Sequence, residues 1–217
     1  MGHQGFLRAR RPEHKQQRRE AILAAARELA LNSGVRTVSL GGVASAVGLA
    51  KSNVTRYFGT REEIYLELTA EGWREWGRAV AERLDGASGP DAVVDALAEP
   101  FLALPLFCDL LGQVSTILEH NVSVDAARHF KHTMYDVVAE VAPLVVAAHP
   151  TLTESEAAEI VQAASGVAGL LYPLITPPPT LVRLYEQDER LAASCPEFLP
   201  SMKRLIAAVI AGLPTLR

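Results

Sequence analysis

Residues 39–58 read SLGGVASAVGLAKSNVTRYF, and this stretch decides the fold. Ser39 is a favoured N-cap residue, so a short helix is expected to run from it to about residue 47. Gly48 supplies the positive φ angle that a tight turn needs, and a second short helix is expected over 51–58. The small residue Ala44 lies four positions before Gly48, where two helices crossing at a steep angle leave little room. This spacing is typical of a helix-turn-helix, although an ordinary helical hairpin with a glycine turn would share it.

The charge of the chain is divided unevenly around this stretch. Residues 1–61 hold 11 Lys and Arg against 3 Asp and Glu, a net charge of +8, whereas residues 62–217 hold 10 against 22, a net charge of -12. Such asymmetry favours contact between the basic part and a polyanion, although a basic tail that only aids solubility would give the same count. Together with the helix-turn-helix pattern, it predicts DNA binding.

Composition excludes several other classes of protein. The chain has 217 residues, of which 49% are apolar and 21% charged, as expected of a soluble protein with one domain or two small ones. Two cysteines are too few for a disulfide scaffold or a cysteine-based zinc module, which fits a reducing cytoplasm. The longest apolar stretch, 160–175, is shorter than the roughly 20 residues of a membrane span, so no membrane contact is expected.

Helical periodicity extends along nearly the whole chain, and no strand-like alternation interrupts it. Gly34 is expected to end the first helix, and the sequences beginning at Thr60 and Thr153 match capping boxes. The fold class is therefore all-α. The expected helices cover residues 16–32, 39–47, 51–58, 60–84, 91–104, 106–121, 124–148, 154–175, 181–192 and 197–213.

Residues about 17–65 resemble the DNA-binding region of the TetR (tetracycline repressor) family. The resemblance rests on the stretch 34–39, on Val43-Ala44, on the stretch 48–51 and on Tyr57-Phe58-x-x-Arg61-Glu62. It implies an N-terminal three-helix helix-turn-helix domain over 16–59 and a helical ligand-binding and dimerisation domain over 60–217. The basic residues of the tail over 1–15 separately predict a flexible arm. Two features depart from the family pattern: Gly41-Gly42 replaces polar helix formers, and Thr55 stands where many members carry Tyr.

The resemblance places the helix from Lys51 in the major groove of DNA. Because Asn pairs well with adenine and Arg with guanine, Asn53 and Arg56 are expected to read bases. Hydroxyls, cations and helix N-termini suit phosphates, and the complete predicted DNA-binding set is Thr37, Ser39, Lys51, Ser52, Asn53, Thr55, Arg56, Tyr57 and Arg61. The arm Arg8–Arg19 is expected either to enter the minor groove or to remain a disordered tail without sequence readout.

The C-terminal helices are expected to form a homodimer and an effector pocket. Two long apolar faces would make a four-helix interface from Ile160, Ala164, Val167, Leu171, Leu174, Met202, Leu205 and Val209, unless they only fill the core of one chain. An apolar pocket with a few polar groups suits a small effector. Its candidate residues, most of which would otherwise be ordinary core, are Trp73, Trp76, Phe101, Phe107, Cys108, Leu110, Gln113, Ile117, His120, Phe130, Met134 and Tyr135.

Other chemistries have weaker support. His129 and His132, with Glu119 and His120 upstream, have the spacing of a metal site, but such pairs are more often surface or core residues. Cys108 lies in an apolar run without a nearby cation, which favours an inert thiol. No phosphate loop or nucleophile elbow is found, so no enzyme and no cofactor are expected. The sequence therefore predicts a ligand-responsive repressor that binds a palindromic operator as a dimer; a nonspecific architectural DNA-binding protein and a helical enzyme are the alternatives.

Overall fold

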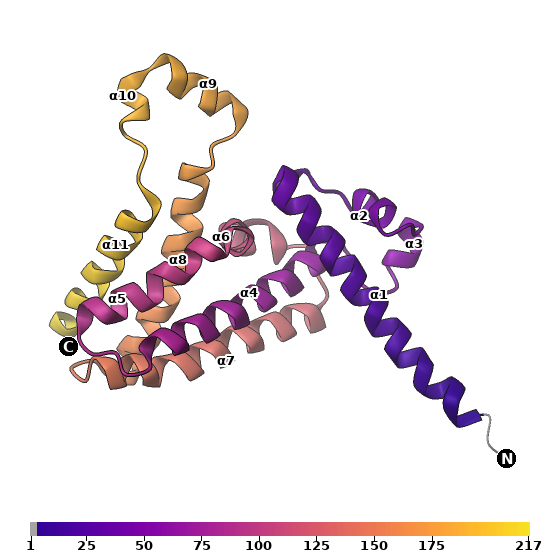
Figure 1. Ribbon diagram of the computed structural model, residues 1–217, viewed down its shortest axis with the longest axis horizontal. Helices are drawn as coiled ribbons and strands as arrows, with labels where there is room; N and C mark the ends of the chain where they lie inside the picture. Colours follow the sequence, from indigo (N-terminus) through magenta and orange to yellow (C-terminus); the bar gives the residue numbers. More distant parts are fainter. Residues whose placement is uncertain (1–3) are drawn as a thin grey trace.

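The computed structural model describes residues 4–217, with side chains from residue 13 onward, and within this range the secondary structure is entirely helical (Figure 1). The predicted all-α class is confirmed. The α-helices are α1 (Gln4–Ser33), α2 (Leu40–Ala46), α3 (Lys51–Val54), α4 (Arg61–Leu84), α5 (Pro90–Ala98), α6 (Pro105–Leu111), α7 (Val124–Ala148), α8 (Glu154–Ile175), α9 (Pro179–Gln187), α10 (Glu189–Ala192) and α11 (Phe198–Gly212). Shorter helical segments are η1 (Val35–Thr37), η2 (Glu99–Ala103), η3 (Val114–Leu118) and η4 (Leu213–Leu216).

We call α1 to α3 the head and α4 to α11 the body. In the body, α4 packs along α7, and α8 packs against α6, α7 and α11 (Figure 1). The head meets the body where α1 contacts α4 and α6. Helix α4 is therefore shared: its first turns hold the head, and its later turns lie in the core of the body.

Helix α1 begins twelve residues earlier than expected. Its backbone is helical from Gln4, through the segment predicted to be a flexible arm. The side chain of Gln16 donates to Glu20 at 3.0 Å, four residues further along, which supports the helix across the expected start. Gly34 ends α1 near the predicted position, with φ at 80°.

Four aromatic rings fill the core of the body next to α4. Trp73 and Trp76 meet edge to face at 5.6 Å, Trp76 stacks on Phe101 at 5.2 Å, and Phe101 stacks on Phe107 at 6.0 Å. We call these four residues the aromatic cluster, and each is at most 3% exposed. Burial raises the pKa of the neighbouring Cys108 thiol to about 12, so the thiol stays protonated near neutral pH.

Several predicted helices are shorter or divided. The regular helix α3 ends at Val54, followed by looser turns, and the expected helix 106–121 stops at Leu111. Beyond Gly112, the amide of Leu118 bonds to the Gln113 carbonyl five residues back, as in a π-helical turn. The expected helix 181–192 is divided into α9 and α10, which contain no buried residue and project from the body (Figure 1).

The two predicted capping boxes differ in outcome. At the start of α8 both halves form, since Thr153 Oγ1 accepts from the Glu156 amide and Glu156 accepts from the Thr153 amide. At the start of α4, Thr60 caps the Glu63 amide at 3.2 Å, but the Glu63 carboxylate accepts from the amides of Gly59 at 2.7 Å and Ser123 at 2.9 Å. The predicted helix start with Thr60 as its cap is confirmed, but the reciprocal half of the box does not form, because the Glu63 carboxylate binds the amides of Gly59 and Ser123 instead.

Helices α6 and α8 touch backbone to backbone. A Cβ atom on Gly169 would lie 2.8 Å from the Gly112 nitrogen, and one on Gly112 would lie 2.8 Å from the Gly169 carbonyl oxygen. No other residue type fits either position without separating the helices. On the same helix α8, a Cβ on Gly166 would meet nothing within 4 Å.

Helix α8 and the segment Phe198–Leu216 are each long and apolar enough to cross a membrane by length and composition alone, although the sequence predicted no span. The apolar residues of α8 also have a role inside the folded protein, because α8 packs against α6, α7 and α11. By length and composition alone α8 could span a membrane, which the sequence did not predict. Its packing nevertheless places α8 in the folded body.

The glycine contact gives a matched pair of substitutions. Gly169→Ala is expected to lower the free energy of unfolding by about 1–3 kcal/mol, because the added methyl group overpacks α8 against α6. Gly166→Ala is expected to leave it unchanged or raise it by up to about 1 kcal/mol, since alanine is the better helix former. Urea unfolding followed by circular dichroism measures both. Equal stability of the two variants would contradict the close contact.

Candidate nucleic-acid interface

The helix-turn-helix forms through the residues expected to build it. Ser39 accepts from the Gly42 amide at 3.0 Å and caps α2, and Gly48 turns the chain with φ at 65°. Ala44 is 2% exposed, and its carbonyl accepts from the Leu49 amide at 2.9 Å across the turn. Val54 is fully buried and holds α3 in place. The two helices thus close onto the head through small and apolar side chains, as the spacing predicted.

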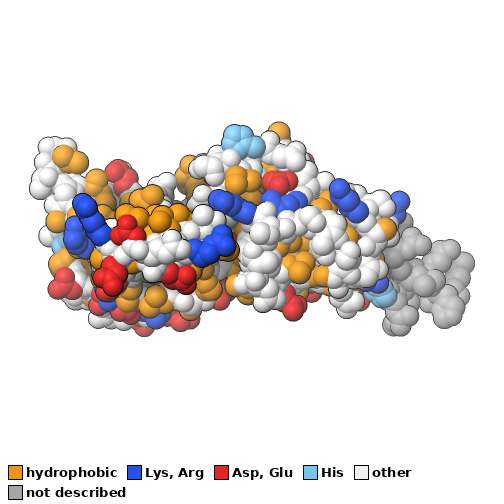
Figure 2. Space-filling model, turned by 90° about the horizontal axis from the view of Figure 1, so that it is seen from above, with side chains coloured by type: hydrophobic (Ala, Val, Ile, Leu, Met, Phe, Trp, Pro, Cys, Tyr) orange, Lys and Arg blue, Asp and Glu red, His pale blue; other side chains and the backbone are white. Residues whose placement is uncertain are grey.

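The polar residues of α3 and the following turn lie on the surface. Those that are exposed are Lys51, Ser52, Asn53, Thr55 and Arg56, while Val54 between them points inward. Each exposed position carries a hydrogen-bonding group, and two carry a positive charge. Figure 2 shows most of the red acidic side chains at the left of the view, over the body, and few of them toward the right. The surface of α3 has the chemistry that base edges and phosphates require.

The hydroxyl groups of the predicted set differ in what they can still donate. Thr37 donates to the Ser33 carbonyl at 2.8 Å, and Thr55 donates to the Ser52 carbonyl at 2.9 Å. Ser39 only accepts, from Gly42, so its own proton is available for a phosphate oxygen. A phosphate accepts hydrogen bonds, and Ser39 is therefore better placed for one than Thr37 and Thr55.

Arg61 is held inside the molecule. Its Nε donates to the Val38 carbonyl at 2.5 Å, its Nη2 donates to the Val35 carbonyl, and its Nη1 pairs with Glu62 at 3.0 Å. The guanidinium also lies 4.8 Å from the centre of the Tyr65 ring. All of these partners join η1 to the first turn of α4. The geometry favours an anchoring role for Arg61 over the predicted contact with phosphate.

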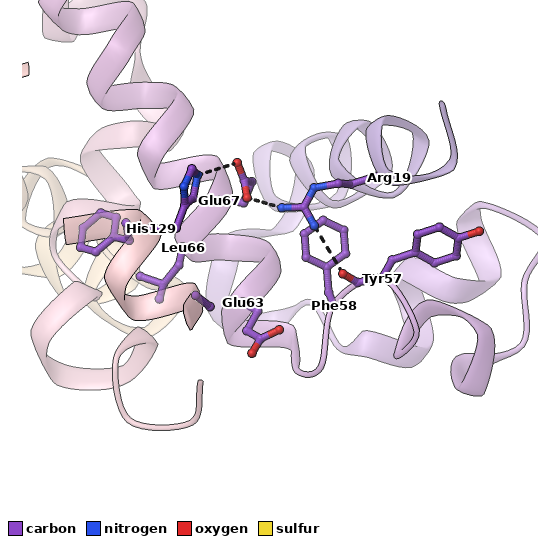
Figure 3. A pocket seen from close by; sticks show the side chains of 9 residues that line it. Arg19, Tyr57, Phe58, Glu63, Leu66, Glu67 and His129 are labelled. Carbon is purple, nitrogen blue, oxygen red and sulfur yellow. Dashed lines mark hydrogen bonds and ion pairs between the residues drawn. The ribbon is translucent and has the colours of Figure 1, made fainter. Parts of the chain in front are cut away.

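A second arginine anchors the other side of the head (Figure 3). The Arg19 guanidinium pairs with Glu67 of α4, donates to the Tyr57 carbonyl at 3.3 Å and lies 4.2 Å above the Phe58 ring. Glu67 in turn lies 3.5 Å from Nε2 of His129 on α7. These residues line a small pocket of about 180 Å³ between the head, α4 and α7. Sequence reasoning missed this connection, because residues 19, 67 and 129 share no local pattern.

Glu63 strengthens the same junction. Burial raises the pKa of its carboxyl, but the hydrogen bonds from Ser123 and Gly59 and the charge of Arg19 together hold it below its ordinary value. Glu63 is therefore ionised near neutral pH, and it ties the turn before α4 to the start of α7. These bonds therefore connect the start of α7 to the base of the head.

The basic arm is described only in part. The side chains of Arg8, Arg10 and Arg11 lie outside the described residues, so the predicted contacts of these arginines with the minor groove are untested. Tyr57, another predicted contact, is half-buried with its carbonyl turned toward Arg19. The contacts of the arm and of Tyr57 with DNA therefore remain predictions.

The predicted effector residues separate into a buried group and a surface group. The aromatic cluster, Cys108, Leu110 and Phe130 are buried, Gln113 is 6% exposed, and Met134 is half-buried. Ile117, His120 and Tyr135 are exposed, and Tyr135 reaches 56%. Of the polar candidates Gln113, His120 and Tyr135, only Gln113 is therefore buried. The expectation that His120 and Tyr135 line an internal pocket is not supported by their positions.

Half of the predicted dimer residues are already buried within one chain. Ile160, Ala164, Leu171 and Met202 are each at most 5% exposed, so no partner is needed to cover them. Val167 and Val209 are half-buried, and Leu174 and Leu205 are exposed. Sequence reasoning missed Leu170, which is 65% exposed and belongs to the outward face of α8.

The metal hypothesis finds no cluster to support it. Among the residues that the structure describes, no group of three or more His, Cys, Asp or Glu side chains lies close enough to hold a metal ion. His129, one of the two histidines considered, instead faces Glu67.

Comparison with known proteins identifies the two parts of the chain separately. Residues 22–68 match the model described as bacterial regulatory proteins, tetR family, and residues 70–217 match the tetracyclin repressor-like C-terminal domain. No curated protein matches the sequence significantly. The second model alone covers more than half of the chain.

Solved structures share the fold at low sequence identity. FadR from Thermus thermophilus, a TetR-family repressor in complex with lauroyl-CoA, is 17% identical with a TM-score of 0.57, over 90% of this chain and 94% of that one. FadR from Bacillus subtilis, in complex with stearoyl-CoA, is 11% identical with a TM-score of 0.55, over 89% and 98%. With its helix-turn-helix head and both family models matched, the chain belongs to the TetR family of DNA-binding transcriptional regulators.

Proposed function

We propose that the protein is a dimeric repressor that binds a palindromic operator and is released by a small apolar or amphipathic effector. The observation that carries this proposal is the row of exposed polar residues on α3, presented by a head that two arginines anchor to α4. Such a row reads DNA only if its orientation is fixed. Because α4 continues into the core of the body, a change in the body alters that orientation.

The roles on DNA follow from what each side chain has available. Asn53 and Arg56 are exposed and can form bidentate contacts with base edges. Lys51 and the free proton of Ser39 suit phosphates. Arg61 and Thr55 are left out of the proposed contacts, because both already donate within the chain.

The outward faces of α8 and α11 form the proposed dimer interface. Leu170 and Leu174 of α8 and Leu205 of α11 are exposed large apolar residues on these packed helices. Ala208 beside them is small and exposed, which permits close approach of a second pair of helices. Two copies would place their heads on half-sites about 34–36 Å apart, as sequence-specific dimers of this kind require.

The proposed effector site is the aromatic cluster of the body. Within the described residues, the indole N–H of Trp73 is buried and has no hydrogen-bond partner, so it can donate to a polar atom of a bound molecule. An effector that separated these rings would push on α4, which carries both tryptophans and holds the head. Since two regulators of similar fold are in complex with acyl-CoA molecules, lauroyl-CoA is the first effector to test.

The test of the proposal is selection of bound sequences from a random DNA pool at about physiological salt, where nonspecific binding is weakest. An enriched palindrome is the expected result, and it supplies the probe for effector titration. Binding without enrichment would contradict the proposal and favour a nonspecific architectural role. Release of the probe by micromolar lauroyl-CoA would support the effector class.

Arg56→Ala is expected to weaken binding to the selected operator by about 1–3 kcal/mol and to relax the preference at one base pair. Lys51→Ala is the matched control: it is expected to weaken binding to all sequences alike and to reduce the salt dependence of binding. Fluorescence anisotropy with the operator and single-base variants measures both. A uniform loss for Arg56→Ala would show that Arg56 contacts only phosphate.

The double substitution Leu170→Glu and Leu205→Glu is expected to convert the dimer to monomers, because four carboxylates would be buried at the interface. Val124→Glu, at an exposed position on α7, is the control and should leave the dimer intact. Sedimentation velocity distinguishes the two states. Dimers that persist in the double variant would place the interface elsewhere.

A further inference from the structure

A cleft of about 530 Å³ lies between the head and the body, apart from the aromatic cluster. Its walls come from the end of α1 and η1, from α6, and from the end of α8 with the prolines that follow. Figure 1 shows the C-terminal end of α1 next to α6. We call it the interdomain cleft. Of the residues predicted to bind an effector, only Gln113 lines it.

Most of the lining is apolar and stiff. Leu106 and Pro105 of α6, Tyr172 and Pro173 of α8, and the run Pro177–Pro179 all face the cleft. Proline rings keep their shape, and the Tyr172 ring offers a flat aromatic surface. Such walls fit a flat aromatic molecule, which loses little freedom when it is held between rigid surfaces.

One polar atom in the wall lacks a partner. Gln113 is 6% exposed, and its Nε2 donates to Asp109 Oδ1 at 2.8 Å, which fixes the side-chain amide. The amide oxygen, Oε1, has no hydrogen-bond partner among the residues that the structure describes. Buried carbonyl oxygens are normally satisfied, whereas this one is unsatisfied and hidden from solvent, so a donor in the cleft reaches it only if the side chain turns toward the cleft.

The charges around the cleft limit the class of ligand. The carboxylate of Asp109 accepts from the Val35 amide at 3.3 Å as well as from Gln113, and Arg36 lies at the exposed rim. One acid and one base leave the lining without net charge. The lining therefore gives neither an anion nor a cation a net electrostatic advantage, and we expect a neutral molecule.

We propose that the interdomain cleft is a second small-molecule site, which binds a neutral aromatic compound whose hydroxyl or N–H group donates to Gln113 Oε1. This goes beyond the effector proposed for the aromatic cluster, since the occupant here touches the head directly. A ligand between η1 and α6 bears on the Val35–Asp109 hydrogen bond that joins the two parts. By linkage, any change it makes in operator affinity is matched by an equal effect of the operator on its own affinity.

The test uses the full chain and 2-naphthol, a neutral aromatic alcohol, in a calorimetric titration. One molecule is expected to bind per chain. The methyl ether, 2-methoxynaphthalene, keeps the rings but lacks the donor, and it is expected to bind at least tenfold more weakly. Equal affinity for both compounds would overturn the role of Gln113. No binding of either compound would overturn the site.

Variants locate the bound probe. Leu106→Trp and Thr176→Trp fill the cleft from α6 and from the end of α8 and are expected to abolish binding. Thr176 is exposed, so its replacement should not disturb folding. Gln113→Met is expected to weaken 2-naphthol at least fivefold and leave 2-methoxynaphthalene unchanged. Leu102→Trp, an exposed position on η2 outside the cleft, is the control. Circular dichroism verifies that each variant is folded.

The outcomes separate this site from the proposed effector site. Binding that survives both tryptophan variants but is lost in Phe101→Leu would place the probe in the aromatic cluster and overturn the interdomain cleft. Loss in Leu106→Trp and Thr176→Trp alone would support the cleft, whether or not lauroyl-CoA releases the operator.

Discussion

The orientation of the head depends on two arginine anchors at the start of α4. Arg61 donates to the carbonyls of Val35 and Val38, and Arg19 joins the Phe58 ring and the Tyr57 carbonyl to Glu67. Both guanidinium groups are largely buried, with side chains 17% and 33% exposed. A partly buried charge is costly unless it is paired and hydrogen-bonded. The head is therefore stable in the orientation in which both guanidinium groups reach these partners. The exposed row on α3 takes its direction from that constraint.

The anchors also decide how a signal from the body would reach the DNA-reading surface. Glu67 contacts Arg19 of the head and His129 of α7, and Glu63 binds the turn before α4 and the start of α7. The head is thus attached to α4 and α7 together, and these two helices pack along each other. A shift of α7 relative to α4 would break one set of bonds unless the head moved with it. In the proposed mechanism, a bound effector selects between two such arrangements.

Sequence predicted the features that depend on local chemistry. Ser39, Gly34 and Gly48 occupy the cap and turn positions expected of them, because an N-cap or a positive φ angle is decided by a few neighbouring residues. The failures involve partners far along the chain. Glu63 matches a capping box, yet Ser123 sixty residues later takes part of its carboxylate. Arg61 matches a family phosphate contact, yet the carbonyls of η1 hold its guanidinium.

The faces of the C-terminal helices show the same limit. Periodicity assigned Leu171 to a dimer interface, but a helix with apolar residues on much of its circumference has more than one candidate inward face. The structure buries Leu171 within the chain and leaves Leu170 65% exposed. Only the packing of α8 on α6, α7 and α11 distinguishes these neighbours. The cleft lining is hidden for a related reason, because it combines η1, α6 and α8, which no single periodic pattern connects.

The last turns of α8 bring the two proposed interfaces together. Leu170 and Leu174 point outward on the proposed dimer face, whereas Tyr172, Pro173 and Thr176 line the interdomain cleft. Gly169, one residue before this segment, fixes α8 against α6 by direct backbone contact. A shift of this segment relative to a partner subunit would therefore change the shape of the cleft. Conversely, a ligand that fills the cleft would press on the residues of the proposed dimer interface. In the proposed dimer, whose geometry would set the spacing of the heads, a ligand in the cleft would affect operator binding through the interface as well as through η1.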